Sequence, residues 1–319
     1  MERRNKKEAE VGDKIPRLAL WPGNLDLLQL EEQLDAGQAG GFHVVPLGPH
    51  TIKRALQRGL SFDDILAEAA RRAVAIDILD GLSSWLPIRH PSASDPVGAA
   101  HFNRHDVQMG EALDIAAALG MTSIVAMSVM DRGIPLDLFI DPFGTFCDRA
   151  SSYGIRIDLE FAPYWSIPDL ASSWRIVQEA GRANSGLMID TWHAYWSSND
   201  INRELDLIDE IPASFLTSLQ LADQKRPRAG MTMRESRAAL GRLFAGEGDI
   251  PIRPFVKALL SKGGLKTIGP EVFARPDTYA ALSISEVGEL AGRTTRNIIA
   301  LADKPATNAE FARGVTTHE

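Results

Sequence analysis

Four oxygen-bearing side chains each come at the end of a short apolar run in the second half of the chain. The runs are IRIDLEFAP, SGLMIDTWHAY, SFLTSLQLAD and LKTIGPEVF, and the side chains are Glu160, Asp190, Gln220 and Glu271. Each run has the length and composition of a buried strand. The carboxyl ends of parallel strands meet at one end of a barrel, so we expect the four side chains to converge there.

Three carboxylates and one amide at one place would repel one another unless a cation joined them. A divalent cation removes that repulsion, and ligation by oxygen alone suits Mg²⁺ or Mn²⁺ better than Zn²⁺. Co²⁺ and Zn²⁺ are the less expected alternatives. Without a metal, the carboxylates would be members of buried ion pairs inside the barrel, and Gln220 would be a hydrogen-bonding residue of its wall.

The rest of the chain provides the elements that must position this site. Strand candidates alternate with helical segments, and they cover residues 16–22, 42–48, 72–81, 122–130, 155–163, 185–195, 214–223 and 265–273. Such alternation implies parallel strands joined by right-handed crossovers. Eight such units predict an α/β fold made of a single (β/α)₈ TIM barrel, with the active site at the carboxyl ends of the strands. A doubly wound open sheet is the alternative, but no GxGxxG follows an early strand.

The predicted organisation is one barrel domain with short tails. Residues 1–14 are polar and charged, and we expect a disordered tail there, followed by the barrel over 15–303 and a loose tail over 304–319. A Pro/Ser-rich loop over 82–98 is long for a connection, and long loops at this end of a barrel often carry function.

Composition limits the partners. The 319 residues carry a formal net charge of −8, which argues against nucleic acid because phosphate-backbone binding needs a basic surface. Cys147 is the only cysteine, so no intrachain disulfide can form, and burial as a small hydrophobe is its expected role. No apolar run reaches membrane-spanning length and no secretory signal is visible. We expect a cytoplasmic protein without a membrane partner.

Five segments resemble the xylose isomerase-like TIM barrels, a family that includes sugar-phosphate isomerases and epimerases. They are LEFAP, IDTWH, LQLAD, GEGDIPIRPFVKAL and PEVF, in this order and at barrel spacing. The resemblance implies that Glu160, Asp190, Gln220 and Glu271 ligate the metal and that His193 binds substrate. Many members have a histidine where this chain has Gln220, and glutamine there is similar to hydroxypyruvate isomerases and some 3-dehydroshikimate dehydratases. By analogy, the family also implies a homodimer or homotetramer.

The predicted chemistry is proton transfer next to a carbonyl, through a metal-stabilised enediolate. Glu160 and Glu271 are the expected catalytic carboxylates, since they come from different strands and could flank the substrate. Reprotonation of the enediolate gives an isomerase or epimerase, which is the predicted function. Loss of a β-hydroxyl gives the alternative, a lyase that dehydrates a 3-dehydroshikimate-like acid or a keto-inositol.

Two further readings are less favoured. Endonuclease IV-type DNA repair is disfavoured by the negative charge and by too few histidines at strand ends for three zinc ions. A non-catalytic binding barrel is disfavoured by the full ligand set.

The expected substrate-binding residues lie near the same strand ends. They are His193, Arg226, Arg228 and His50. The two arginines could hold a carboxylate or phosphate by paired hydrogen bonds, although a solvated loop is an equally good reading for either one. Trp85, Trp165, Trp192 and Trp196 lie just beyond strand ends, where they would either wall a pocket for a ring-sized substrate or belong to the core.

Overall fold

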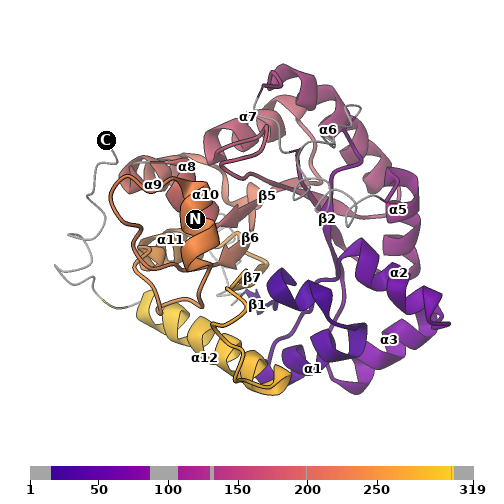
Figure 1. Cartoon of the computed structure of the whole chain (residues 1–319). Helices are drawn as coiled ribbons and strands as arrows, with labels where there is room; N and C mark the ends of the chain where they lie inside the picture. The colour runs from indigo at the N-terminus through magenta and orange to yellow at the C-terminus, as the bar shows by residue number, and fades with distance from the viewer. Residues whose placement is uncertain (1–15, 87–106, 130–132, 199, 303, 305–319) are drawn as a thin grey trace, which may run out of the picture.

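The strands form one curled parallel sheet. The computed structural model describes residues 16–86, 107–129, 133–198, 200–302 and 304, and Figure 1 shows the strands encircled by helices. Within these residues the sheet has seven strands in the order β1-β7-β6-β5-β4-β3-β2, all parallel. They are β1 (Arg17–Leu18), β2 (Ile78–Leu82), β3 (Ser123–Ala126), β4 (Arg156–Glu160), β5 (Ser185–Asp190), β6 (Leu216–Leu221) and β7 (Thr267–Pro270). The predicted TIM barrel is confirmed.

The ring closes through residues 42–48, which we expected to be a full strand. Instead, single parallel bridges join Val44 to Ala19 on one side and to Ala75 on the other, and Leu47 to Leu79. Pro46 lies between the bridging residues and has no N–H to donate, so a continuous ladder cannot form there. The strand expected over 72–81 also begins later, at Ile78, because the helix before it ends in a turn at Ala73 with a φ of 53°.

Helices surround the ring. They are α1 (Leu30–Gly40), α2 (Pro49–Gln57), α3 (Phe62–Arg71), α5 (Met109–Ala118), α6 (Asp137–Ser151), α7 (Leu170–Ala180), α9 (Ile201–Glu210), α11 (Ile252–Lys262) and α12 (Ile284–Ala302). Two shorter helices, α8 (Thr191–Ser197) and α10 (Met233–Leu240), follow the carboxyl ends of β5 and β6. None of the described helices combines the length and apolar character needed to cross a membrane. The tail predicted for 1–14, the tail predicted for 304–319 apart from residue 304, and residues 87–98 of the predicted 82–98 loop lie outside the described residues.

The first and last helices pack against each other and join the two ends of the barrel (Figure 1). Glycines allow this close approach: a Cβ at Gly292 would lie 2.0 Å from the carbonyl oxygen of Gly40, and one at Gly288 would lie 2.2 Å from that of Ala36. Any larger residue at either position would push α12 away from α1.

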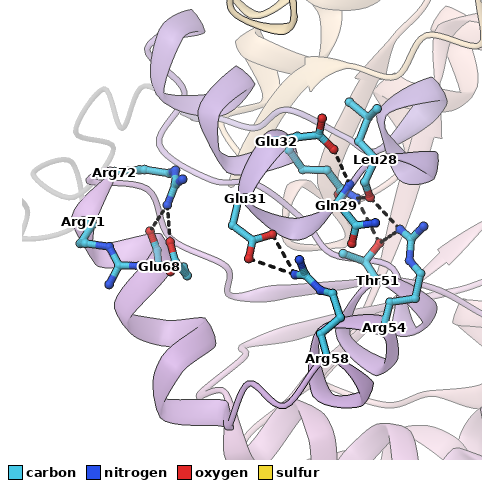
Figure 2. Close-up of polar contacts among 11 residues, drawn as sticks. Leu28, Gln29, Glu31, Glu32, Thr51, Arg54, Arg58, Glu68, Arg71 and Arg72 are labelled. Atoms are coloured by element: carbon cyan, nitrogen blue, oxygen red, sulfur yellow. Dashed lines mark hydrogen bonds and ion pairs between the residues drawn. The ribbon is translucent and has the colours of Figure 1, made fainter.

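Ion pairs and hydrogen bonds join α1 to the segment of α2, and Figure 2 shows them together with the pairing of Arg72 with Glu68 at the end of α3. Arg58, directly after α2, contacts both carboxylate oxygens of Glu31 on α1, at 2.8 and 3.0 Å. Arg54 donates to the carbonyl oxygen of Leu28 at 2.7 Å, just before α1 begins. Exposed pairs of this kind contribute about 0–1 kcal/mol each, so they orient the helices more than they stabilise the fold.

The core has two parts. The larger part lies between the strands and the surrounding helices, and it includes Cys147, which is fully buried as predicted. The smaller part fills the inside of the barrel and consists of Ala19, Trp21, Val44, Ile78, Val125, Met127, Ala162, Trp165 and Met188. Strand residues alternate between the two parts, so the side chain two positions beyond an inner residue also faces the barrel interior.

Candidate metal and active site

Four buried side chains meet at the carboxyl ends of the strands. They are Glu160 at the end of β4, Asp190 at the end of β5, His193 in the first turn of α8 and Glu271 directly after β7. One ligand atom from each lies within 4.8 Å of the others, and each residue is at most 7% exposed. The structure therefore brings together the three carboxylates and the histidine that the sequence analysis selected.

Asp190 is oriented by the helix that it begins. Its Oδ1 accepts hydrogen bonds from the backbone N–H groups of Trp192 at 2.6 Å and His193 at 2.9 Å, which makes it the N-cap of α8. This fixes the carboxylate and leaves Oδ2 directed toward the cluster. The same turn places the His193 ring, whose Nε2 lies 3.6 Å from Oε1 of Glu160.

Gln220 lies beside Asp190 in the sheet register and is completely buried. Neither its side-chain oxygen nor its side-chain nitrogen has a hydrogen-bond partner among the described residues. A buried polar group left in this state costs about 1–3 kcal/mol, so an orphaned amide in a native fold needs an explanation. An oxygen ligand for a cation is one, and the donor set of three carboxylates and an amide fits a hard divalent ion.

Arg242 is the cationic member of the site, and the sequence analysis did not select it. Its Nη1 donates to Oδ2 of Asp190 at 2.7 Å and to Oε2 of Glu271 at 3.2 Å. Its guanidinium also lies 4.6 Å from the Trp192 ring and 5.0 Å from the Phe273 ring. At 2% exposure it is buried, and stacking on aromatic faces suits a guanidinium in such surroundings.

The loop that carries Arg242 is pinned to the end of β6. Asp223 and Leu243 exchange two backbone hydrogen bonds, at 2.7 and 2.9 Å, and the side chain of Gln224 donates to the carbonyl oxygen of Gly241 at 3.0 Å. The Asp223 carboxylate accepts from the backbone N–H groups at 246, 248 and 250. Glu247 accepts from the Tyr279 hydroxyl at 2.6 Å and so helps to organise the loop.

Burial dominates the electrostatics of the cluster. It raises the pKa of Glu160 well above its usual range, and Glu271, Asp80 and Asp190 raise it further. Burial likewise raises the pKa of Glu271, against the opposing influence of Arg242. Burial lowers the pKa of His193 to about 3, so its imidazole is neutral at physiological pH. A neutral imidazole can serve as a hydrogen-bond donor or as a ligand without adding charge.

The sequence analysis also missed Asp80, which lies on β2 and faces the barrel interior. It is 8% exposed, and burial together with the nearby Asp26 raises its pKa to about 7. Its charge in turn raises the pKa of both Glu160 and Glu271, so it faces the cluster. The strand-end rule that selected the other carboxylates would have found Asp80 in RAVAIDILDG, since it too lies near the tip of an apolar run.

The other predicted substrate-binding residues lie elsewhere. Arg226 and Arg228 are exposed on the loop after β6, and the described contacts do not bring either into the cluster. The backbone N–H of Arg226 donates to Asp249, which holds that segment against the outer part of the loop. His50, in the first turn of α2, has its Nε2 3.0 Å from Oδ1 of Asp26 and so lies on the same side as Asp80.

Aromatic rings surround His193. The ring centroids of Tyr164, Trp165 and Trp192 lie 5.9, 6.0 and 5.5 Å from that of the imidazole. Trp85 instead packs against Phe139 and Phe143 in the outer core, and its Nε1 donates to the carbonyl oxygen of Met127. Of the tryptophans expected either to wall a pocket or to belong to the core, Trp165 and Trp192 therefore lie beside the cluster and Trp85 belongs to the core.

Comparison with known proteins places this geometry in a family. Residues 35–288 match the model of the xylose isomerase-like TIM barrels. Two curated relatives are inosose isomerases, from Halalkalibacterium halodurans (26% identical) and Bacillus subtilis (24% identical). The matches cover 47% and 50% of this chain, and the chain spans about half the length of each relative, 50% and 54%.

A solved structure agrees in fold. The IOLI protein, solved with a bound zinc atom, superimposes with a TM-score of 0.71 and 19% identity, over 89% of this chain and 98% of that one. Residues 35–288, which match the family model, include Glu160, Asp190, His193, Arg242 and Glu271. The chain belongs to the xylose isomerase-like TIM barrel family.

Proposed function

We propose that this protein is a divalent-metal-dependent isomerase or epimerase that moves a proton next to the carbonyl of a sugar or cyclic keto-polyol. The observation that carries the proposal is the placement of two buried glutamates, Glu160 and Glu271, in one cluster but on different strands, β4 and β7. A carbon atom held between them can lose a proton to one carboxylate and regain it from the other. The inosose isomerase relatives support this class of reaction.

The residues that would hold the cation are Glu160, Asp190, Gln220 and Glu271. Their burial, the mutual repulsion of the carboxylates and the unmet hydrogen bonding of Gln220 support this assignment. When bound, a divalent cation polarises a carbonyl and stabilises negative charge on the substrate oxygens. Mn²⁺ and Mg²⁺ suit the oxygen donors best, and the zinc in the structural neighbour makes Zn²⁺ the first alternative to test.

The protein's own groups have separate tasks in this scheme. Glu160 and Glu271 exchange the proton with substrate carbon. His193, neutral and enclosed by aromatic rings, donates a hydrogen bond to a substrate oxygen. Arg242 keeps Asp190 and Glu271 oriented through its bonds to both carboxylates, and the rings packed on it exclude water from these contacts.

One observation supports a second candidate function. Asp80 is a buried carboxyl outside the proposed ligand set, with a pKa raised to about 7, so a large fraction of it carries a proton near neutral pH. A protonated carboxyl facing the substrate could protonate a departing hydroxyl, which a dehydratase requires and an isomerase does not. The lyase is therefore the second candidate.

The test combines metal content with isotope exchange. The purified protein is loaded in turn with Mn²⁺, Mg²⁺ and Zn²⁺, its metal is measured by elemental analysis, and it is incubated with inososes and ketoses in D₂O. We expect about one metal ion per chain. NMR and mass spectrometry should show that the substrate takes up deuterium without losing water. Loss of water from the substrate would identify the lyase instead.

Matched variants make this result specific. Glu160→Ala should lower metal content and abolish exchange, whereas Glu179→Gln, an exposed change on α7, should leave both intact. If no metal binds under any loading condition, or if Glu160→Ala exchanges deuterium as fast as the parent protein, the proposal is wrong.

A further inference from the structure

The side of the barrel formed by β1 and β2 contains a polar group that the proposed proton transfer does not use. Asp80 is 8% exposed, and its side chain accepts no hydrogen bond from any described residue. It lies two positions beyond Ile78, whose side chain packs inside the barrel, so Asp80 points into the same interior one layer higher. Its effect on Glu160 and Glu271 agrees with that direction.

The groups behind Asp80 do not neutralise it. Asp26 is the charged group that raises the pKa of Asp80 in addition to burial, and it is also a carboxylate. His50 contacts Asp26 at 3.0 Å, so the imidazole is directed to Asp26. Arg54 donates to the carbonyl oxygen of Asp26 rather than to a carboxylate. This side of the barrel therefore presents carboxyl oxygens, and near pH 8 mostly negative charge, to whatever lies between it and the metal ligands.

A second, independent observation points to a ligand here. Trp21 follows β1, is 1% exposed, and its Nε1 has no hydrogen-bond partner among the described residues. Its backbone N–H donates to Pro270, directly before Glu271, so the ring is at the same end of the barrel as the cluster. Buried indole N–H groups usually find an acceptor, and this one lacks it within the described protein.

An unpartnered acceptor and an unpartnered donor, above apolar side chains of the barrel interior, match the chemistry of a hydroxylated ring. Hydroxyls donate to a carboxylate and accept from an indole, while C–H faces pack on aromatic and aliphatic surfaces. A phosphate or carboxylate placed against Asp80 and Asp26 would instead be repelled. The cations near the cluster lie on the side away from β1 and β2. Arg242 pairs with Asp190, and Arg237 lies over the Tyr164 ring.

We propose that Asp80 and Trp21 form a hydroxyl-binding subsite that selects an uncharged polyhydroxy ketone, with its neutral hydroxyls toward β1 and β2. This rests on the proposed function and narrows its substrate class: sugar phosphates and dehydroshikimate-like acids are excluded from this side, and cyclic keto-polyols are accepted. Asp80 acts here by binding the ring, so its loss weakens affinity more than it slows the chemical step.

Binding of unreactive probes tests the subsite separately from catalysis. The metal-loaded full chain is titrated at pH 8, where Asp80 is mostly ionised, with myo-inositol, a neutral cyclic polyol, and with quinate, a cyclic polyol that carries a carboxylate. Heat or tryptophan fluorescence is recorded. Hydrogen bonds to a charged group are strong enough that Asp80→Asn should weaken myo-inositol binding about tenfold. The same variant should weaken quinate less or strengthen it, because the repelling charge is gone.

Controls separate the subsite from a general loss of structure. Asp63→Asn makes the same chemical change at an exposed position of α3 and should leave both affinities unchanged. Trp21→Phe keeps a six-membered aromatic ring but removes the pyrrole ring with its N–H donor, and should weaken myo-inositol binding by about threefold to tenfold. For the reaction itself, Asp80→Asn should raise KM for a keto-polyol about tenfold and change kcat by less than about threefold.

The possible outcomes are distinct. If Asp80→Asn binds myo-inositol as the parent protein does, or if the parent protein prefers quinate, the subsite is wrong even when deuterium exchange is observed. If polyol binding depends on Asp80 but no keto-polyol exchanges deuterium, the subsite stands and the proton-transfer function is wrong.

Discussion

The two sides of the barrel treat buried charge in opposite ways. On the β4–β7 side, Asp190 and Glu271 share Arg242, and Asp190 is further held by two backbone N–H groups of α8. On the β1–β2 side, Asp80 accepts no hydrogen bond from the described residues, and the carboxylate of Asp26 raises its pKa further. A paired carboxylate is fixed in place, whereas an unpaired one retains its hydrogen-bonding capacity for a ligand.

This contrast suggests a division of work. The paired side has the rigidity that metal ligands and acid–base groups need, since small displacements of such groups lower the rate strongly. The unpaired side has the unmet polar groups that a substrate can satisfy. Substitutions on each side of the barrel test this division of work.

The largest effect is expected for the catalytic carboxylate after β7. Glu271→Gln preserves the shape of the side chain but cannot accept a proton, so deuterium exchange into substrate should fall about 10²–10⁴-fold. Single-turnover exchange in D₂O measures this. An equal loss in Asp80→Asn would contradict the division between the two sides, because that variant should act through KM.

Arg242→Met removes the cation from the paired side while keeping much of the apolar volume. Two buried carboxylates then lack their partner, so the metal-free protein should lose about 3–5 kcal/mol of unfolding free energy. Urea denaturation with EDTA and with Mn²⁺ measures this. A bound divalent cation would take over the neutralisation, so saturating Mn²⁺ should recover much of the loss, and an equal loss in both conditions would argue against a metal beside Arg242.

Asp80→Asn, in contrast, should raise the unfolding free energy. Burial raises the pKa of Asp80 in the folded protein to about 7 from an ordinary value of 3.8, so the folded state binds more protons than the unfolded state between these values. The unfolding free energy therefore falls as pH rises through that window. At pH 8 the variant should be more stable by about 1–3 kcal/mol, and below pH 4 the difference should vanish.

Thermal denaturation across pH 4–8 follows this difference, and the exposed Asp63→Asn change provides the baseline. A variant that is less stable than the parent protein at pH 8 would mean that Asp80 has a stabilising partner in the folded chain.

The smallest effect on stability is expected at Gln220. Gln220→Met replaces an amide without hydrogen bonds by an apolar chain of similar length, so the metal-free protein should gain about 1 kcal/mol. Metal affinity should fall at the same time, by about 10–100-fold, and calorimetric titration with Mn²⁺ measures this. A variant that binds metal as tightly as the parent would remove Gln220 from the ligand set.

Much of the fold could be predicted from sequence because its signals are local. Apolar runs of strand length alternate with amphipathic helices, and this order allows few topologies. Each of Glu160, Asp190 and Glu271 lies at or just beyond the tip of such a run, so the closing of the barrel alone brings them together. The exception was 42–48, where Pro46 interrupts the ladder and only the closed ring provides the partners for Val44.

The place of Arg242 in the site depended on tertiary structure. Arg242 lies 52 residues beyond Asp190 in a loop, and it reaches the cluster because Asp223 and Gln224 pin that loop to β6. An arginine in a polar loop has no periodicity to indicate its direction, and Arg226 and Arg228 appeared equally suitable in the sequence. What the sequence determined alone was the order of strands and the carboxylates at their tips. Which charges are paired, and which are left for a ligand, was decided by packing, because pairing depends on distances between segments far apart in the chain.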